Sequence, residues 1–199
     1  MIGNNDRLKK WELSLLIALC IALCIGVRAE ARQSRLQSEL VRLHVIAVSD
    51  DEYEQELKLR VRDAVLEFLS PMLGNTANAE SAKRVISENL DGIRNAAEGC
   101  SEGRAVTVTL GEEYYPTRSY EGFSLPAGHY DSLRVTLGEG EGHNWWCVVF
   151  PPLCISAAEA DRAMSVLNEE DRRLITESEG YEYRFRIAEL WGMLTAKFR

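Results

Sequence analysis

The sequence lacks the residue patterns on which most catalytic and metal sites depend. Its three histidines and the three cysteines beyond residue 29 share no ligand-like spacing, and no C-x-x-C pair occurs. These absences argue against a zinc site and against a thiol-disulfide exchange centre. The glycine-rich stretch 138–142 lacks the Lys and Ser/Thr of a phosphate-binding loop, and its two glutamates would repel phosphate. We therefore expect no metal ion and no cofactor.

Basic clusters are also missing from the sequence. The formal net charge of the 199 residues is −8. Residues 1–29 carry four basic and two acidic side chains, so the remainder has 19 basic against 29 acidic residues. Such a surface repels the phosphate backbone of DNA or RNA. Nucleic acid is therefore not expected among the partners, and membrane contact is expected only through the N-terminal segment.

A short apolar run near the N-terminus decides the expected compartment. Basic residues at positions 7, 9 and 10 precede the run Leu13–Val27, and small residues at 27 and 29 offer a cleavage site. This pattern predicts a cleaved export signal over residues 1–29. An uncleaved membrane anchor is the alternative, although the run is shorter than the about 20 residues that span a bilayer. In both cases we expect the rest of the chain outside the cytoplasm, beginning with a linker or helical stalk over residues 30–40.

The most apolar stretch beyond the N-terminus, Asn144–Phe150, predicts a strand that is buried on both faces. Alternation puts Trp145 on one face of this strand and Trp146 on the other. One of the two is expected in the core. The other is either an exposed anchor for a protein partner or covered by helices as well.

The segment 42–71 predicts a strand followed by a helix. Arg42–Val48 is apolar enough for a buried strand, and Ser49 with Glu52 forms a capping-box pattern. Apolar residues then recur at helical spacing, and Pro71 marks the expected end of the helix. Arg62 and Asp63 within this helix could form a buried ion pair or a partner contact, although a solvated helix face is the simpler interpretation.

Further elements are expected on both sides of the tryptophan strand. A second helix is predicted from about Asn78 to a cap at Gly99, and strands are predicted at 106–110 and 130–137. Residues 114–118 and 122–125 are expected to be irregular, with the residues of a type II turn at 126–128. The strand 130–137 should pair antiparallel with 144–150 through a flexible connection, 138–144.

The end of the chain is more charged than the rest. Residues 156–168 predict a weakly apolar helix, 169–180 a polar linker and 181–187 an edge strand before a terminal helix. We therefore predict an α+β fold: a mixed or antiparallel sheet with helices packed on it. Residues 41–155 should form the main part of a single domain, and 156–199 an extension of it.

Candidate chemistry is sparse. His44 and Asp50 flank the end of the first strand, where an acid-base pair is conceivable, but a packed histidine and a helix-capping aspartate are more common. Cys147 with His143 or His129 would be a cysteine nucleophile, but burial on the strand raises the pKa of a thiol and dulls it. We expect no catalytic residues and no enzyme. The alternative is an extracytoplasmic hydrolase or thiol enzyme that uses Cys147 or His44.

Cysteine usage depends on the expected compartment. In an oxidising compartment Cys147 and Cys154 are close in sequence, with a Pro-Pro corner between them, which predicts a disulfide and leaves Cys100 free. Such a small loop would contribute roughly 2–3 kcal/mol of stability if unstrained. Three reduced, buried thiols are the alternative.

Three segments together resemble one known family. LVRLHVIAVSD (40–50), LKLRVRDAVLEFLSP (57–71) and YPTRSYEGFSLPAGHYDSLRVTLGEGEGHNWWCVVFPPLC (115–154) are similar to stage II sporulation protein R. The similarity covers roughly residues 40–155, and the run that ends in NWWCVVFPPLC is long enough to be specific. Val48 stands where the family commonly has Asn, and Cys100 is an additional cysteine.

The resemblance implies a function that the residues alone do not show. Members of this family are made in the forespore and exported toward the intermembrane space. There they signal to a membrane-embedded aspartic protease, which removes the pro-sequence of a mother-cell sigma factor. The resemblance brings no catalytic residues. For such a ligand we predict a partner-contact surface around the tryptophans and the first strand-helix junction, formed by His44, Ser49, Asp50, Arg62, Trp145 and Trp146.

Overall fold

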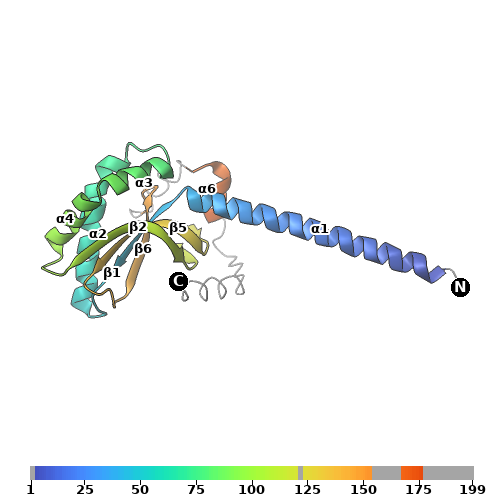
Figure 1. Ribbon diagram of the computed structural model, residues 1–199, viewed down its shortest axis with the longest axis horizontal. Coiled ribbons are helices and arrows are strands. Elements are labelled where there is room, and N and C mark those ends of the chain that lie inside the picture. Colours follow the sequence, from blue (N-terminus) through green and yellow to red (C-terminus); the bar gives the residue numbers. More distant parts are fainter. Residues whose placement is uncertain (1–2, 121–122, 154–166, 177–199) are drawn as a thin grey trace. The chain divides into compact units, whose positions relative to one another are not determined.

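The computed structural model describes residues 3–120, 123–153 and 167–176 (Figure 1). It divides into two compact units, residues 1–36 and residues 37–199. The first unit holds nearly all of helix α1 (Gly3–Ser38). In the described part of the chain, this one helix is long and apolar enough to cross a membrane, by length and composition. It is compatible with a signal segment or an anchor, and residues 30–38 continue it as a helical stalk.

A four-stranded mixed sheet forms the centre of the second unit, as the sequence predicts. Its strand order is β2-β5-β1-β6. Strand β1 runs parallel to β5 and antiparallel to β6, and β2 runs antiparallel to β5. The bounds are β1 (Val41–Ile46), β2 (Val106–Tyr115), β5 (Gly128–Leu137) and β6 (Asn144–Phe150).

The prediction that 130–137 pairs directly with 144–150 is wrong. Strand β1 lies between β5 and β6 and bonds to both. Val41, Leu43 and Val45 of β1 are fully buried, and a strand this apolar is most stable at the centre of a sheet, where both of its edges are paired. The connection from β5 to β6 therefore passes the end of β1, where the Gly142 N–H donates to the Ala47 carbonyl at 3.0 Å.

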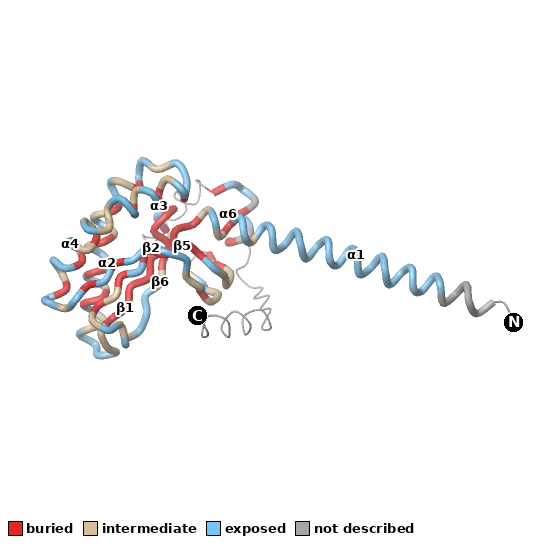
Figure 2. Tube along the Cα trace, viewed as in Figure 1, coloured by how far each residue is buried: buried red, intermediate tan, exposed pale blue. Residues whose placement is uncertain are grey.

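Three helices cover one face of this sheet (Figure 1). They are α2 (Glu52–Leu73), α3 (Ala79–Glu88) and α4 (Leu90–Cys100). The core lies between these helices and the sheet, where the buried segments face one another (Figure 2). Its central members are Val41, Leu43, Val45, Val61, Val65, Leu69, Ile86, Ile93, Leu133 and Val135.

Helix α2 begins and ends differently from the prediction. Its N-cap is Asp51, without a side-chain cap hydrogen bond, because the Ser49 hydroxyl donates to the Asp51 carboxylate at 2.7 Å. The predicted capping box of Ser49 with Glu52 is therefore wrong. Pro71 lies inside the last turn rather than after it. Proline has no N–H, so one hydrogen bond of this last turn is missing. The turn still forms, because it buries Leu73 in the core.

The second predicted helix is two helices. Asn78 caps α3, and its side chain and that of Ser81 form a reciprocal capping box, which supports the predicted start. At Asn89 the backbone leaves the helical region (φ −118°, ψ 17°), so α3 ends and α4 begins. The predicted cap at Gly99 is wrong because α4 continues to Cys100 and is capped by Ser101.

The opposite face of the sheet carries a small hairpin, β3 (Arg118–Tyr120) with β4 (Phe123–Leu125). We call this side of the sheet the hairpin face. The residues of this hairpin were expected to be irregular, so that prediction is wrong. Tyr115 was also expected outside a strand, but it is the last residue of β2. Of the expected turn residues 126–128, only Gly128 lies in a strand, as the first residue of β5.

A last described helix, α6 (Glu169–Thr176), contacts β4. It lies in the segment 169–180 that was expected to be a linker. The helix expected at 156–168, apart from its last two residues, and the strand and helix expected after 180 lie outside the described residues.

The loop between β5 and β6 is packed rather than flexible, contrary to the prediction. Gly140 has φ +68°, and a Cβ there would lie 2.6 Å from the Thr136 methyl carbon. A Cβ at Gly142 would lie 2.6 Å from the Ser49 carbonyl carbon and closer still to its oxygen. Glycine is needed at the first position for its backbone conformation and at the second for close approach.

Candidate functional site

Trp145 is the large apolar side chain that strand β6 exposes. Its exposed fraction is 37%, whereas Cys147 to Phe150 are buried, so the predicted burial on both faces holds only for the second half of the strand. The Arg62 guanidinium of α2 lies 4.6 Å from the centre of the Trp145 ring. The same guanidinium pairs with Asp63 at 2.7 Å. A cation on the face of an indole ring is attracted to it, so Arg62 helps to hold Trp145 in place.

The same two elements, α2 and β6, also line an apolar pocket. We call it the α2–β6 pocket; it is lined by Leu66, Leu69, Leu73, Val148, Val149 and Pro152, with Glu67 and Ser70 as its polar members. Its volume is about 230 Å³. This is smaller than the roughly 300–1,000 Å³ typical of pockets for small-molecule ligands. The dimensions and the apolar lining suit one or two side chains of a protein partner.

The hairpin face carries a buried polar network centred on His44 and Glu113. The His44 Nδ1 lies 2.9 Å from Glu113 Oε1, and its Nε2 lies 2.8 Å from Asn144 Oδ1. The Ser132 hydroxyl donates to Glu113 at 2.9 Å, and Arg134 pairs with Glu113 at 2.8 Å. The network joins all four strands of the sheet, since its members come from β1, β2, β5 and β6.

The charge of Glu113 is stabilised within this network. Burial raises the pKa of the Glu113 carboxyl. The opposing influences together lower it by more: the hydrogen bond and charge of His44, the charge of Arg134 and the hydrogen bond of Ser132. The net pKa is below its ordinary value. Ser132 bonds to the carboxylate rather than to the imidazole, so the three side chains do not form the nucleophile-base-acid order of a hydrolytic triad.

Arg42 is a buried residue that the sequence prediction passed over. Its guanidinium carbon lies 4.0 Å from the centre of the Tyr115 ring and 5.0 Å from that of Tyr130. It also donates to the Tyr120 hydroxyl, which in turn donates to the Trp146 carbonyl at 3.3 Å. Burial raises the pKa of the Tyr115 and Tyr130 hydroxyls. The sequence did contain a sign of this site: Arg42 and His44 alternate with apolar residues on β1, which places both polar side chains on one face of the strand.

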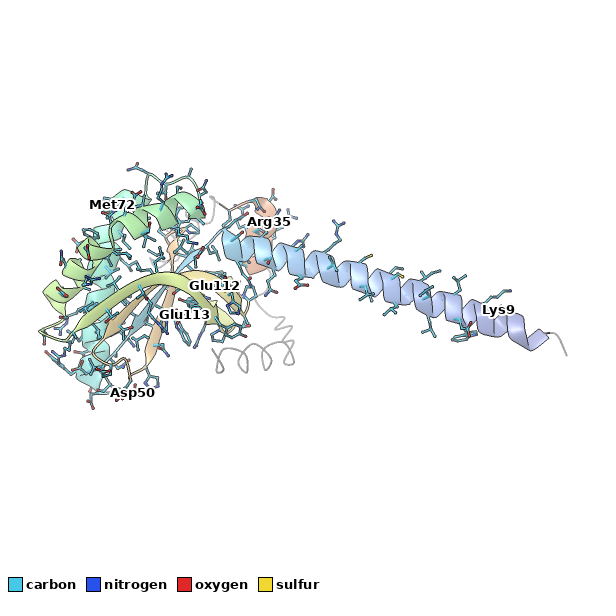
Figure 3. All side chains as sticks on the ribbon, in the orientation of Figure 1. Lys9, Arg35, Asp50, Met72, Glu112 and Glu113 are labelled. Carbon is cyan, nitrogen blue, oxygen red and sulfur yellow. The ribbon has the colours of Figure 1, made fainter. Side chains whose placement is uncertain are left out.

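The predicted pair of His44 with Asp50 does not form. Asp50 lies near the start of α2 (Figure 3) and accepts the His143 N–H at 2.6 Å, while also pairing with the His143 ring. Lys58 donates to the His143 carbonyl at 3.0 Å from a buried position, and that burial lowers the pKa of its ammonium. Asp50 and Lys58 therefore tie the β5–β6 loop to α2.

The six residues of the predicted contact surface fall into three places. Arg62 of α2 and Trp145 of β6 come together, and neither lines the α2–β6 pocket. His44 and Trp146 lie on the hairpin face with ring centres 5.5 Å apart, and Arg118 stacks on Trp146 at 3.8 Å. Ser49 and Asp50 lie at the strand-helix junction. Sequence reasoning missed the pocket because its leucines belong to the ordinary apolar stripe of α2.

Cys147 is disulfide-bonded, whereas Cys20, Cys24 and Cys100 of the described residues have free thiols. The predicted partner, Cys154, lies outside the described residues, so the pairing stays a prediction. No cluster of His, Cys, Asp or Glu in the part that the structure describes could hold a metal ion. The thiol of Cys147 is thus not the free thiolate that a cysteine nucleophile requires.

Comparison with known proteins places the chain in a family. The family model of stage II sporulation protein R matches residues 37–160. Stage II sporulation protein R of Bacillus subtilis (strain 168) is 32% identical over 149 residues, which cover 73% of this chain and 66% of that protein. The match thus spans about two-thirds of the relative's length. No solved structure matches. The chain therefore belongs to the stage II sporulation protein R family, and with it to the proteins of sporulation.

Proposed function

We propose that this chain is an extracytoplasmic protein ligand of sporulation that activates a membrane-embedded aspartic protease. In this proposal the chain is exported from the forespore to the intermembrane space, and the activated protease removes the pro-sequence of a mother-cell sigma factor. Family membership supports the sporulation role. The protease partner and the direction of export rest on the resemblance. The chain itself acts without catalysis.

The observation that carries the proposal is the position of Trp145. It is an exposed tryptophan with the Arg62 guanidinium over its ring, and an apolar pocket between the same two elements, α2 and β6, suits side chains rather than a cofactor. Tryptophan and arginine are over-represented among the residues that dominate binding energy at protein interfaces. We therefore take Trp145, Arg62 and the α2–β6 pocket as the protease-binding surface.

Binding alone is sufficient for activation if the ligand prefers the active state of the protease. A ligand shifts an equilibrium only by the difference between its affinities for the two states. A shift from 1:99 to 99:1 requires about 5.5 kcal/mol of such preference. A few well-buried aromatic and apolar contacts supply energies of this size, since single hot-spot residues contribute about 2 kcal/mol or more.

The test is co-expression with the candidate protease and its precursor sigma factor in a non-sporulating host, with and without residues 1–29. We expect processing that depends on this chain and on its export segment. Trp145→Ala should reduce processing at limiting ligand about 30-fold, which corresponds to about 2 kcal/mol. Tyr53→Ala is the matched control, because Tyr53 is an exposed aromatic residue of α2 that does not line the pocket.

The enzyme alternative predicts a different result. Folded Asp50→Ala and His44→Gln proteins should still activate the protease if the chain is a ligand, since neither residue belongs to the Trp145–Arg62 contact or lines the α2–β6 pocket. Loss of activation in both folded variants, with full activity of Trp145→Ala, would favour an enzyme and would refute the ligand proposal.

A further inference from the structure

The two edges of the four-stranded sheet differ in how their backbone groups are satisfied. At the β6 edge, the Trp146 carbonyl accepts from the Tyr120 hydroxyl and the Val148 carbonyl accepts from the Leu153 N–H, both at 3.3 Å. The hairpin and the turn after β6 therefore close that edge against a further strand. Strand β2 forms the other edge.

The backbone groups of β2 can be assigned to one side or the other. The Gly138 N–H donates to the Ala105 carbonyl at 2.8 Å, so Ala105 faces β5. In an antiparallel ladder this orientation alternates, and the odd-numbered residues of β2 therefore bond to β5. The N–H and C=O groups of the even-numbered residues 106–112 point away from the sheet. Within the described ranges these outward groups have no hydrogen-bond partner.

Residues 106–110 of β2 carry no charged side chain to protect this edge, and the two charges of the strand, Glu112 and Glu113, lie beyond them. Residues 106–113 contain no proline and no lysine, and their register with β5 runs without a bulge. Monomeric proteins commonly protect an edge strand by one of these devices or by covering it. An open, regular edge of this length is a template for another strand.

We propose that β2 pairs with β2 of a second copy of this chain, antiparallel, across a two-fold axis at Thr109. The two sheets then form one continuous sheet. Because the β6 edge is closed, the assembly ends at two copies and does not grow into a filament. This inference is independent of the proposed protease ligand function.

The register follows from the outward groups and the side chains. An axis at Thr109 pairs Val106 with Glu112 and Val108 with Leu110, and uses about eight hydrogen bonds. If the axis is moved to Leu110, the same residues can form only about six hydrogen bonds between the two copies. It would also place Val108 opposite Glu112.

The side chains favour self-pairing in this register. Val108 and Leu110 belong to the helix-covered face, so their contact extends the apolar layer across the axis. Thr109 meets its own copy, and Thr–Thr pairs are favourable across strands. Glu112 and Glu113 lie next to each other on β2 (Figure 3), yet neither meets another carboxylate in this register. The acidic chain can therefore pair with itself without opposing like charges at this edge.

Cysteine cross-linking of the full chain in detergent micelles tests the axis. The reference variant replaces Cys20, Cys24 and Cys100 by Ser and keeps the disulfide of Cys147. Thr109→Cys in this background should form a disulfide-linked dimer on mild oxidation, because residues on the axis have Cβ atoms about 4.5–5.5 Å apart. Thr107→Cys is the matched control. In the proposed dimer the two residues at position 107 would lie about 13 Å apart along the strands, which is too far for a disulfide. The yield of disulfide-linked dimer should therefore be at least tenfold lower than for Thr109→Cys.

A charge at the axis tests the dimer without cross-linking. Thr109 is exposed, so Thr109→Lys should fold, as circular dichroism would verify. We expect light scattering to give a protein mass of twice 22.4 kDa for the unmodified chain and for Asn95→Lys, an exposed change on α4, but 22.4 kDa for Thr109→Lys. A dimer that survives Thr109→Lys, a monomeric unmodified chain, or equal cross-linking at positions 107 and 109 would overturn the proposal.

Discussion

Glu113→Gln should destabilise the fold measurably, because Glu113 is the centre of the polar network on the hairpin face. Its carboxylate contacts His44, Ser132 and Arg134. Glutamine has nearly the same size and keeps an acceptor oxygen for the Ser132 hydroxyl. The substitution therefore removes the charge and leaves the packing almost unchanged.

The magnitude follows from the burial of each partner. His44 is 4% exposed, and a hydrogen bond to a charged group contributes about 1.5–3 kcal/mol at such a site. The Arg134 side chain is 47% exposed, so its ion pair contributes at most about 0.5 kcal/mol. Together these losses predict a decrease of about 2–3 kcal/mol in the free energy of unfolding. For a chain of this size the midpoint Tm should fall by about 4–12 °C.

The pH dependence gives the same prediction a second test. The pKa of Glu113 is below its ordinary value in the folded protein. A carboxylate of this kind contributes stability above its unfolded pKa, and the contribution is lost as the pH falls through the folded pKa. The difference between the unmodified chain and Glu113→Gln should thus be complete at pH 7 and shrink below about pH 4.5.

Thermal unfolding of the full chain in detergent, followed by tryptophan fluorescence and circular dichroism, measures both effects. Trp146 is a suitable reporter because its ring lies 5.5 Å from that of His44. Equal stability of the two proteins at pH 7 would show that the network contributes nothing. A difference that stays constant down to acidic pH would show that the charge of Glu113 is not its source.

Two further predictions concern single positions of the backbone. Gly142→Ala should cost about 1–3 kcal/mol, because a Cβ there meets the Ser49 backbone, whereas Gly99→Ala on the exposed surface of α4 meets open space and should add about 0.5–1 kcal/mol. Parallel thermal unfolding would contradict this reasoning if both variants changed in the same direction. Asn78→Ala should cost about 1 kcal/mol through loss of the α3 capping box, and an unchanged Tm would show that α3 does not depend on it.

The existence of the strands followed from the sequence, but their order did not. Alternating apolar residues in Val106–Leu110 and Leu133–Leu137 predicted two strands of the sheet, and both are present. The error concerned the neighbours of the tryptophan strand. A short connection suggests a hairpin, and nothing in the local sequence shows that β1 is inserted there. The burial of β1 on its core face, with a partner at each edge, decides the order.

Capping and loop chemistry were predicted with mixed success. The sequence predicted a helix start near Asn78, and the structure shows that the side chains of Asn78 and Ser81 satisfy donors there, which is a local property. Ser49 matched the same kind of pattern, yet its hydroxyl bonds to Asp51 and the helix begins after that residue. The Gly138–Gly142 loop looked flexible by composition. Its glycines instead permit close packing against β1 and β5, and that contact partner is not visible in the sequence.

The candidate surface was predicted in part. Trp145 and Arg62 lie far apart in the sequence, and the structure brings them into contact. Trp146 and His44 were assigned to the same surface, but the pleat of β6 turns Trp146 to the hairpin face. There His44, Trp146 and Arg118 pack together. Sequence spacing identified the residue types, whereas the face on which each one lies required the register of β6 with β1.

Three of the candidate catalytic side chains are buried, whereas Asp50 and His143 pair at the surface. A catalytic group must reach its substrate, but His44, Ser132 and Cys147 are each at most 6% exposed, and Cys147 is in a disulfide. In these positions polar groups fix strands to one another and specify the sheet. The exposed Trp145 lies where a partner can contact it. If both the proposed dimer and the proposed protease binding hold, each copy carries one binding surface, so a ligand pair would hold two protease chains together, and the second contact would gain from its high effective concentration.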